Sequence, residues 1–167
     1  MTSSLFSHAP EPEDRGAGTA AAPAVTVSRI VPRELHEAFN GFIEYIHLWW
    51  PESFSEYGEG MFPAFEGDAV IETADTGETA LWAKVLRRIQ DSALDLQWVA
   101  GHDPQQPTDV TVRFETAGRD ETGAEQTEVT VVHDGFSRLP DPRETQAAFA
   151  RSWDDAMTRY ARFMGAR

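Results

Sequence analysis

The sequence has no cysteine, few basic residues and no long apolar run. The absence of cysteine excludes disulfide bonds, thiolate metal ligands and a cysteine nucleophile. Only 14 Lys and Arg stand against 28 Asp and Glu, for a net charge of −14, whereas binding to nucleic-acid phosphates requires clustered basic residues. The apolar runs are far shorter than the roughly 18 residues of a membrane-spanning helix, and the N-terminus lacks the pattern of a secretory signal. We therefore expect a cytoplasmic protein that binds no nucleic acid and does not span a membrane.

The remaining composition suits a single globular domain. Of the 167 residues, 41% are hydrophobic and 11% are aromatic. A chain of this size buries roughly two-thirds of the surface that its unfolded form exposes. Residues 1–22 differ from the rest, because they are rich in Ala, Pro, Gly, Ser and acidic residues and show no periodicity. We expect a disordered N-terminal tail over 1–22 and one folded domain over 23–167.

The strongest pattern is an amphipathic helix over residues 141–164. Asp141 is placed to be the N-cap, Pro142 the first helical residue and Glu144 the partner of Asp141 in a capping box. Gly165 follows where a helix commonly ends. One apolar stripe runs along the helix at steps of three and four residues, formed by Phe149, Trp153, Met157, Tyr160 and Met164. A helix with such a face must pack against a large apolar surface.

Alternation of apolar and polar residues predicts strands between the tail and this helix. The pattern predicts a first strand over 24–31, short helices over 32–42 and 42–50, and a loop over 52–67. Further strands are predicted over 68–73, 78–90, 93–99, 108–116 and 126–133. Strands grouped between helices indicate an α+β domain with an antiparallel sheet of about six strands, buried on one face. Only the C-terminal helix is long enough to cover that face.

Four segments follow one another in a familiar order. They are VPRELHEAF at 31–39, LWWP at 48–51, TEVTVVHDGF at 127–136 and SWDDAMTRYARFM at 152–164. Together they resemble the START-like (SRPBCC) helix-grip superfamily, and within it the bacterial homologues of the activator of heat-shock protein 90 ATPase. Two positions depart from that pattern. Ser152 stands where Gly usually precedes Trp, and EGDAV at 66–70 stands where a Gly-Gly turn is common.

The resemblance implies a helix-grip fold, in which a curved antiparallel sheet wraps around the long C-terminal helix. In many relatives a cavity between sheet and helix holds an apolar molecule. The aromatic residues of this chain, more numerous than a helix-on-sheet core requires, favour such a cavity. The candidate ligand contacts are Trp49, Trp50, Phe62, Trp82, Trp98, Phe114, His133, Phe149, Trp153 and Met157. The alternative is that the same side chains fill the core completely.

Three polar features could add chemistry to such a cavity. If the valines of its strand point inward, His133 does too, either at the cavity rim or hydrogen-bonded into the following turn. Arg29 shares a face with inward valines and would need a carboxylate partner, Glu72 or Glu44, or an anionic ligand. Glu44 and His47 form a Glu-x-x-His pair, but a di-metal site requires two such pairs, so a surface position is favoured. We expect no metal, no cofactor and no catalytic residue.

The leading functional hypothesis is a protein that binds a small hydrophobic or lipid-like molecule between the sheet and the C-terminal helix. One alternative is a chaperone-interacting protein similar to the activator of heat-shock protein 90 ATPase. Another is a cyclase or hydrolase, which would need an ionisable group such as His133 or Glu44 facing an open pocket. The sequence leaves open the identity of the ligand and whether the protein is a monomer or a homodimer.

Overall fold

A curved antiparallel sheet of seven strands forms the centre of the computed structural model, which describes residues 22–167. The strands lie in the order β1-β7-β6-β5-β4-β3-β2. Their bounds are β1 Val25–Val31, β2 Phe62–Glu66, β3 Ala69–Thr73, β4 Thr79–Ile89, β5 Ala93–Trp98, β6 Thr108–Arg119 and β7 Glu125–Asp134. The predicted tail over 1–22 lies outside the described residues except for Ala22, and the boundary between tail and domain stays a prediction.

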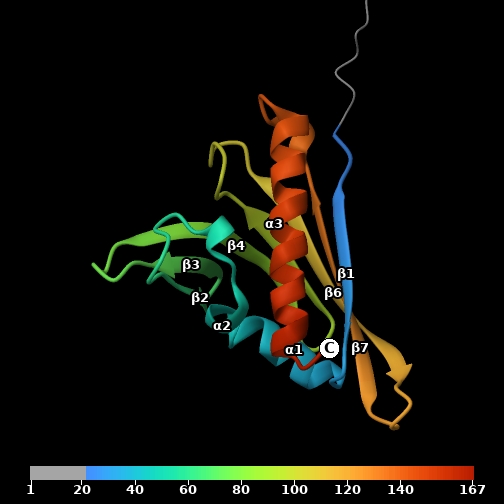
Figure 1. Cartoon of the computed structure of the whole chain (residues 1–167). Helices are drawn as coiled ribbons and strands as arrows, with labels where there is room; N and C mark the ends of the chain where they lie inside the picture. Colours follow the sequence, from blue (N-terminus) through green and yellow to red (C-terminus); the bar gives the residue numbers. More distant parts are fainter. Residues whose placement is uncertain (1–21) are drawn as a thin grey trace, which may run out of the picture.

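One long helix, α3 (Pro142–Phe163), crosses the inner face of the sheet (Figure 1). Two short helices, α1 (Leu35–Ile43) and α2 (Ile46–Trp49), follow β1 and lie beneath the C-terminal end of α3. The 3₁₀ turns η1 (Glu52–Phe54) and η2 (Phe136–Arg138) complete the secondary structure. The predicted α+β helix-grip architecture is confirmed, with seven strands in place of about six.

Period-two alternation places the core on one face of the sheet. In β6, Val110, Val112 and Phe114 are buried, and their neighbours in sequence are more exposed. The same alternation in β7 buries Val129 and Val131. Successive side chains of a strand point to opposite faces, so these residues all meet the apolar stripe of α3.

The predicted stripe of α3 is buried as a whole, from Phe149 to Met164. The helix ends in a Schellman motif, because the Gly165 N–H donates to the Arg162 carbonyl and the Ala166 N–H to that of Ala161. The start of the helix corrects one prediction. Asp141 is the N-cap residue, but its side chain makes no capping hydrogen bond within residues 22–167, so the expected capping box does not form.

The region predicted as a loop over 52–67 contains a strand instead. β2 pairs with β3 through a two-residue turn at Gly67 and Asp68, and Gly67 has a φ of +57°. Pro63 lies within β2 and argues against a strand in the interior of a sheet. β2 is an edge strand, where the missing N–H of proline leaves no ladder hydrogen bond unmade. Within residues 22–167 no helix has the length and apolarity to cross a membrane.

Candidate functional site

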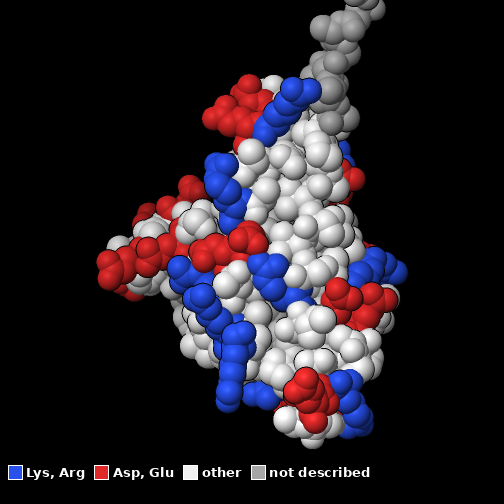
Figure 2. Space-filling view, turned by 45° about the vertical axis from the view of Figure 1, so that its right-hand side comes forward, with Lys and Arg blue, Asp and Glu red and all other residues white. Residues whose placement is uncertain are grey.

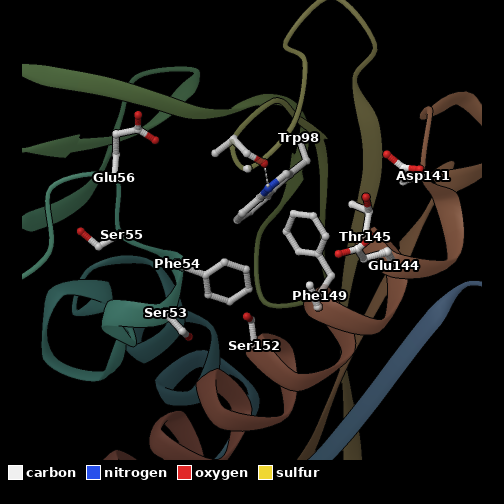
Figure 3. Close-up of a pocket in the computed structure, with 13 residues that line it drawn as sticks. Ser53, Phe54, Ser55, Glu56, Trp98, Asp141, Glu144, Thr145, Phe149 and Ser152 are labelled. Atoms are coloured by element: carbon white, nitrogen blue, oxygen red, sulfur yellow. Dashed lines mark hydrogen bonds between the residues drawn. The ribbon is translucent and has the colours of Figure 1, made fainter.

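A pocket of about 450 Å³ opens between η1, the end of β5 and the first half of α3 (Figure 3). The α3 residues that line it share one helical face with the N-cap residue Asp141 and recur along it as far as Ser152. Its lining residues are Ser53, Phe54, Ser55, Glu56, Trp98, Ala100, Gly101, Asp141, Glu144, Thr145, Ala148, Phe149 and Ser152. Three segments far apart in the chain therefore build one site.

The bottom of the pocket is a group of three aromatic rings, Phe54, Trp98 and Phe149, which we call the aromatic floor. The ring centroid of Phe54 lies 5.7 Å from that of Trp98 and 6.0 Å from that of Phe149. The Trp98 indole N–H donates to the Ala100 carbonyl at 3.1 Å, which fixes the plane of the indole. Trp98 and Phe149 are 1% and 7% exposed, so half-buried Phe54 is the ring of the aromatic floor that presents most surface to the pocket.

The mouth of the pocket is polar. Four hydroxyl side chains line it, those of Ser53, Ser55, Thr145 and Ser152. Three carboxylates do so as well, and we call Glu56, Asp141 and Glu144 the acidic rim. Figure 3 shows Glu56 on one side of the aromatic floor and the other two residues of the acidic rim on the opposite side. An apolar bottom with a few polar groups at the mouth is the usual composition of a small-molecule site.

A fully buried carboxylate, Glu72 on β3, holds one wall of the pocket in place. It accepts hydrogen bonds from the Trp82 indole at 2.8 Å and from the backbone N–H groups of Glu56 at 2.9 Å and Tyr57 at 3.4 Å. The Ser55 hydroxyl donates to the same carboxylate. Several donors on one buried carboxylate offset the cost of removing it from water. Glu72 thereby anchors the segment that carries Ser55 and Glu56 to the sheet.

Tryptophan side chains fill the space behind the aromatic floor. The Trp50 ring stacks on Phe54 with centroids 4.8 Å apart, and it lies 5.0 Å from Trp82 and 6.0 Å from Trp153. The centre of the space between sheet and α3 is therefore packed, and the opening lies towards the N-terminal end of the helix. The buried indole N–H of Trp50 has no hydrogen-bond partner within residues 22–167.

A chain of hydrogen bonds leads from Trp153 in the core to the loop beside the pocket. The Trp153 indole donates to His133 Nδ1 at 3.0 Å, so the proton of the neutral imidazole is on Nε2. That N–H donates to the Thr108 hydroxyl at 2.7 Å, and the hydroxyl donates to His102 Nε2 at 3.1 Å. His102 Nδ1 then donates to the Asp103 carbonyl at 3.1 Å. Every donor in the chain has one acceptor.

This environment favours the neutral form of His133. Burial, together with a smaller effect of the neighbouring His102, lowers the pKa of His133 to about 3. Phe149 covers the imidazole, with ring centroids 4.5 Å apart, and the imidazole does not line the pocket. His133 therefore acts as a hydrogen-bonding core residue behind the aromatic floor. The prediction that it points inward is confirmed, and its partners lie on β6 and α3 rather than in the following turn.

The ten candidate ligand contacts fall into three groups around this pocket. Two of them, Trp98 and Phe149, line it. Behind the aromatic floor lie Trp50, Trp82, His133 and Trp153. Away from the pocket, Trp49, Phe114 and Met157 are buried in the core, and Phe62 is 50% exposed on β2, where it stacks on His47. Whether a ligand contacts any of the ten stays a prediction.

The other polar candidates lie outside the pocket. Arg29 points toward α3 as predicted, but its partners are Asp154 at 2.6 Å and Thr158 at 3.1 Å, rather than Glu72 or Glu44. Glu44 is exposed, as the favoured surface interpretation of the Glu-x-x-His pair requires. Within residues 22–167 no three His, Asp or Glu side chains are grouped so that they could hold a metal ion.

Sequence reasoning missed most of the residues that line the pocket. Glu144 was assigned to a capping box, and Phe54 was placed in an unstructured loop. One signal was available on the helix, because Glu144, Thr145, Ala148 and Ser152 share a face with Phe149. The contribution of η1 had no comparable signal, since its position depends on the buried carboxylate of a distant strand.

Solved structures share the fold of this chain. CalC from Micromonospora echinospora, described as a self-sacrificing resistance protein, is 20% identical with a TM-score of 0.60, covering 85% of this chain and 94% of CalC. The chain has the helix-grip fold. The protein MLL2253 from Mesorhizobium loti is 20% identical with a TM-score of 0.58, covering 85% of this chain and 96% of its own. The anthrahydroquino-γ-pyrone synthase Txn09, described as complexed with SUM, is 20% identical with a TM-score of 0.58, covering 86% and 97%.

The structural similarity establishes the fold, and sequence identities of 20% do not establish a family. No known family model matches the sequence, and no curated protein matches it. The predicted START-like, helix-grip architecture is thus supported by structure alone.

Proposed function

We propose that this protein binds a small, largely apolar molecule in the pocket between η1, β5 and α3. The observation that carries the proposal is the aromatic floor at the bottom of an open pocket of about 450 Å³. Pockets that hold drug-sized molecules commonly measure roughly 300–1,000 Å³ and combine apolar walls with a few polar groups. The complex described for Txn09 supports the proposal, because that protein shares the fold.

The two ionisable groups that the cyclase or hydrolase hypothesis named, His133 and Glu44, do not line the pocket. An acid–base reaction needs a titratable group within hydrogen-bond reach of the substrate. His133 lies behind Phe149 with both ring nitrogens already hydrogen-bonded, and Glu44 is not among the lining residues. The chaperone-interacting alternative, and with it the narrower resemblance to the activator homologues, stays a prediction that draws no support from this pocket.

Filling the pocket tests the proposal. Ala148 is exposed on α3 and lines the pocket, so Ala148→Trp places an indole in the opening without disturbing the core. The control is Ala124→Trp, the same substitution at an exposed turn between β6 and β7. We expect 1-naphthylmethanol to shift the indole N–H resonance of Trp98 in an NMR titration of the wild type and of the control. Ala148→Trp should bind it at least about tenfold more weakly.

Two outcomes would contradict the proposal. In one, 1-naphthylmethanol leaves the Trp98 resonance of the wild type unmoved up to its solubility limit, and charged naphthyl analogues do the same. In the other, Ala148→Trp binds as well as the wild type, which would place the probe elsewhere on the molecule.

A further inference from the structure

The charges around the pocket all have one sign. Of the thirteen described residues that line it, the three of the acidic rim are ionisable carboxylic acids, and none is Lys or Arg. Glu56 follows η1 on one side, and Asp141 and Glu144 begin α3 on the other (Figure 3). A group held at the mouth of the pocket therefore lies between carboxylates from two directions.

Within residues 22–167, neither a salt bridge nor a side-chain hydrogen bond involves the carboxylate of Glu56, Asp141 or Glu144. Some of the other carboxylates in these residues do have such partners. Arginine partners are held by Asp154, Asp95, Glu125, Asp109 and Asp155. The acidic rim thus keeps its charge available for a ligand.

The start of α3 does not reverse this sign. A helix N-terminus carries a partial positive charge of about half an elementary charge, which would attract anions if it were alone. Two carboxylates of the acidic rim, Asp141 and Glu144, lie on that same helical end, and Glu56 adds a third from across the pocket. Together they outweigh the helix end, so the net field at the mouth is negative.

The aromatic floor favours the same ligand charge. The faces of Phe54, Trp98 and Phe149 carry the negative end of the ring quadrupole, which attracts cations. Phe54, the most exposed of the three rings, also gives an apolar body a surface on which to pack. The overall net charge of −14 adds a long-range attraction for cations.

We infer that the ligand of this pocket is a cationic amphiphile, with an aromatic or alicyclic body on the aromatic floor and a protonated amine at the acidic rim. The inference rests on the proposed function, since it specifies the charge of the molecule that the pocket binds. The hydroxyls of Thr145 and Ser152 also line the pocket and can hydrogen-bond to a polar link between body and amine.

Three probes with one ring system test the charge preference. They are 1-naphthylmethylamine, 1-naphthylmethanol and 1-naphthylacetate, which are positive, neutral and negative at pH 7. We expect the amine to bind the wild type about tenfold more tightly than the alcohol, and the acetate to bind most weakly. Because the carboxylates are exposed, the preference should shrink as NaCl is raised from 20 to 500 mM.

The variant that removes the preference is the triple amide Glu56→Gln, Asp141→Asn, Glu144→Gln. It should bind the alcohol as the wild type does and bind the amine no more than about threefold better than the alcohol. A second triple variant, Glu66→Gln, Glu115→Gln, Glu121→Gln, changes the net charge equally at exposed positions outside the pocket. It should keep most of the preference for the amine. Unchanged binding of the alcohol shows that the triple amide is folded and that its pocket is intact.

The outcomes separate this inference from the proposed function. If all three probes bind the wild type equally, or the acetate binds best, the inference is wrong and the pocket still binds apolar molecules. If both triple variants lose the preference equally, the attraction comes from the net charge and not from the acidic rim, which also overturns the inference. Failure of all three probes to bind overturns the proposed function itself.

Discussion

His133 links three elements of the fold through a single buried imidazole. It belongs to β7, accepts from Trp153 of α3 and donates to Thr108 at the start of β6. A second proton would sit on Nδ1, where it would face the indole N–H of Trp153 and replace an attraction by a repulsion. The hydrogen-bond chain therefore requires the neutral imidazole, in agreement with the lowering of the His133 pKa by burial.

The pH dependence of stability follows from that requirement. The pKa of His133 is about 3 in the folded protein and near 6.5 when the chain is unfolded. Between these values the unfolded chain binds a proton that the folded protein does not, so the free energy of unfolding falls as the pH is lowered. Above pH 6.5 the neutral His133 imidazole costs the folded protein no stability. Below pH 6.5 the free energy of unfolding falls by up to about 1.4 kcal/mol per pH unit because of this residue.

Urea denaturation at pH 7.5, 6 and 5 measures this slope. The comparison is His133→Gln, whose amide oxygen can accept from Trp153 and whose NH₂ can donate to Thr108 without titrating. The many carboxylates contribute equally to both proteins, so the difference in slope isolates His133. Parallel pH profiles for the two proteins would show that the imidazole is not kept neutral in the fold.

At the residue scale the sequence predicts which way a side chain points better than it predicts which residue that side chain contacts. Strand alternation correctly aimed His133 and Arg29 inward, because it depends only on the two-residue period of a strand. It could not name Asp154 as the partner of Arg29, since the two lie 125 positions apart. Glu72 lies on the same face of β3 as buried Val70, so alternation predicts that its carboxylate is buried. The sequence does not show which groups donate hydrogen bonds to that carboxylate.

Close approach of two helices depends on a single glycine. Gly41 in α1 faces the C-terminal end of α3, and a Cβ added there would overlap Met164 Sδ and lie 2.9 Å from Met164 Cε. Gly41→Ala should lower the free energy of unfolding by less than about 1 kcal/mol, because the flexible end of Met164 must move while the higher helix propensity of alanine offsets part of that cost. Chemical denaturation measures the loss.

A double-mutant cycle shows whether crowding is the cause. In a Met164→Ala background the space beside Gly41 is larger, so Gly41→Ala should cost clearly less than it does in the wild type. An equal cost in both backgrounds would mean that the alanine disturbs α1 in some other way.

Whole elements were predicted where periodicity and burial agree. β5, β6 and β7 lie in the middle of the sheet, and their buried faces follow the alternation in the sequence. β2 was missed because it lies at the edge, where pairing needs no buried alternation and tolerates Pro63. β2 matters for the site, because it connects η1, which lines the pocket, to β3, which carries Glu72.

At the scale of the whole molecule, the pocket lies away from the middle of the space between the sheet and α3. Sequence could predict that a long helix covers a curved sheet, but it could not decide between a filled core and a cavity. That choice depends on how the rings of Trp50, Trp82 and Trp153 stack against one another, and stacking is set by backbone positions that no local pattern encodes. Their packing fills the centre and leaves the pocket at the N-terminal end of α3.

The acidity of the molecule should make its stability depend on salt. Figure 2 shows acidic and basic side chains interspersed on one face, while the chain as a whole has a net charge of −14. Repulsion among the excess carboxylates opposes the compact state and is screened by added ions. We expect the melting temperature at pH 7.5 to rise by roughly 2–4 °C between 10 and 200 mM NaCl.

Calorimetry at two pH values tests the origin of this effect. Near the sequence pI of about 4.6 the net charge vanishes, so the rise with NaCl should largely disappear. A melting temperature that is unchanged or lower in 200 mM NaCl at pH 7.5 would show that attractive ion pairs outweigh the repulsion.

The clustering of the tryptophans also affects the intrinsic fluorescence of this protein. Trp50 lies 5.5 Å from Trp49, 5.0 Å from Trp82 and 6.1 Å from Trp98, and Trp98 lies 5.4 Å from Trp153. At such separations we expect the five indoles to exchange excitation energy, so that their fluorescence responds as a set. Trp98 lines the pocket, so a quencher bound there should lower the fluorescence of the whole set.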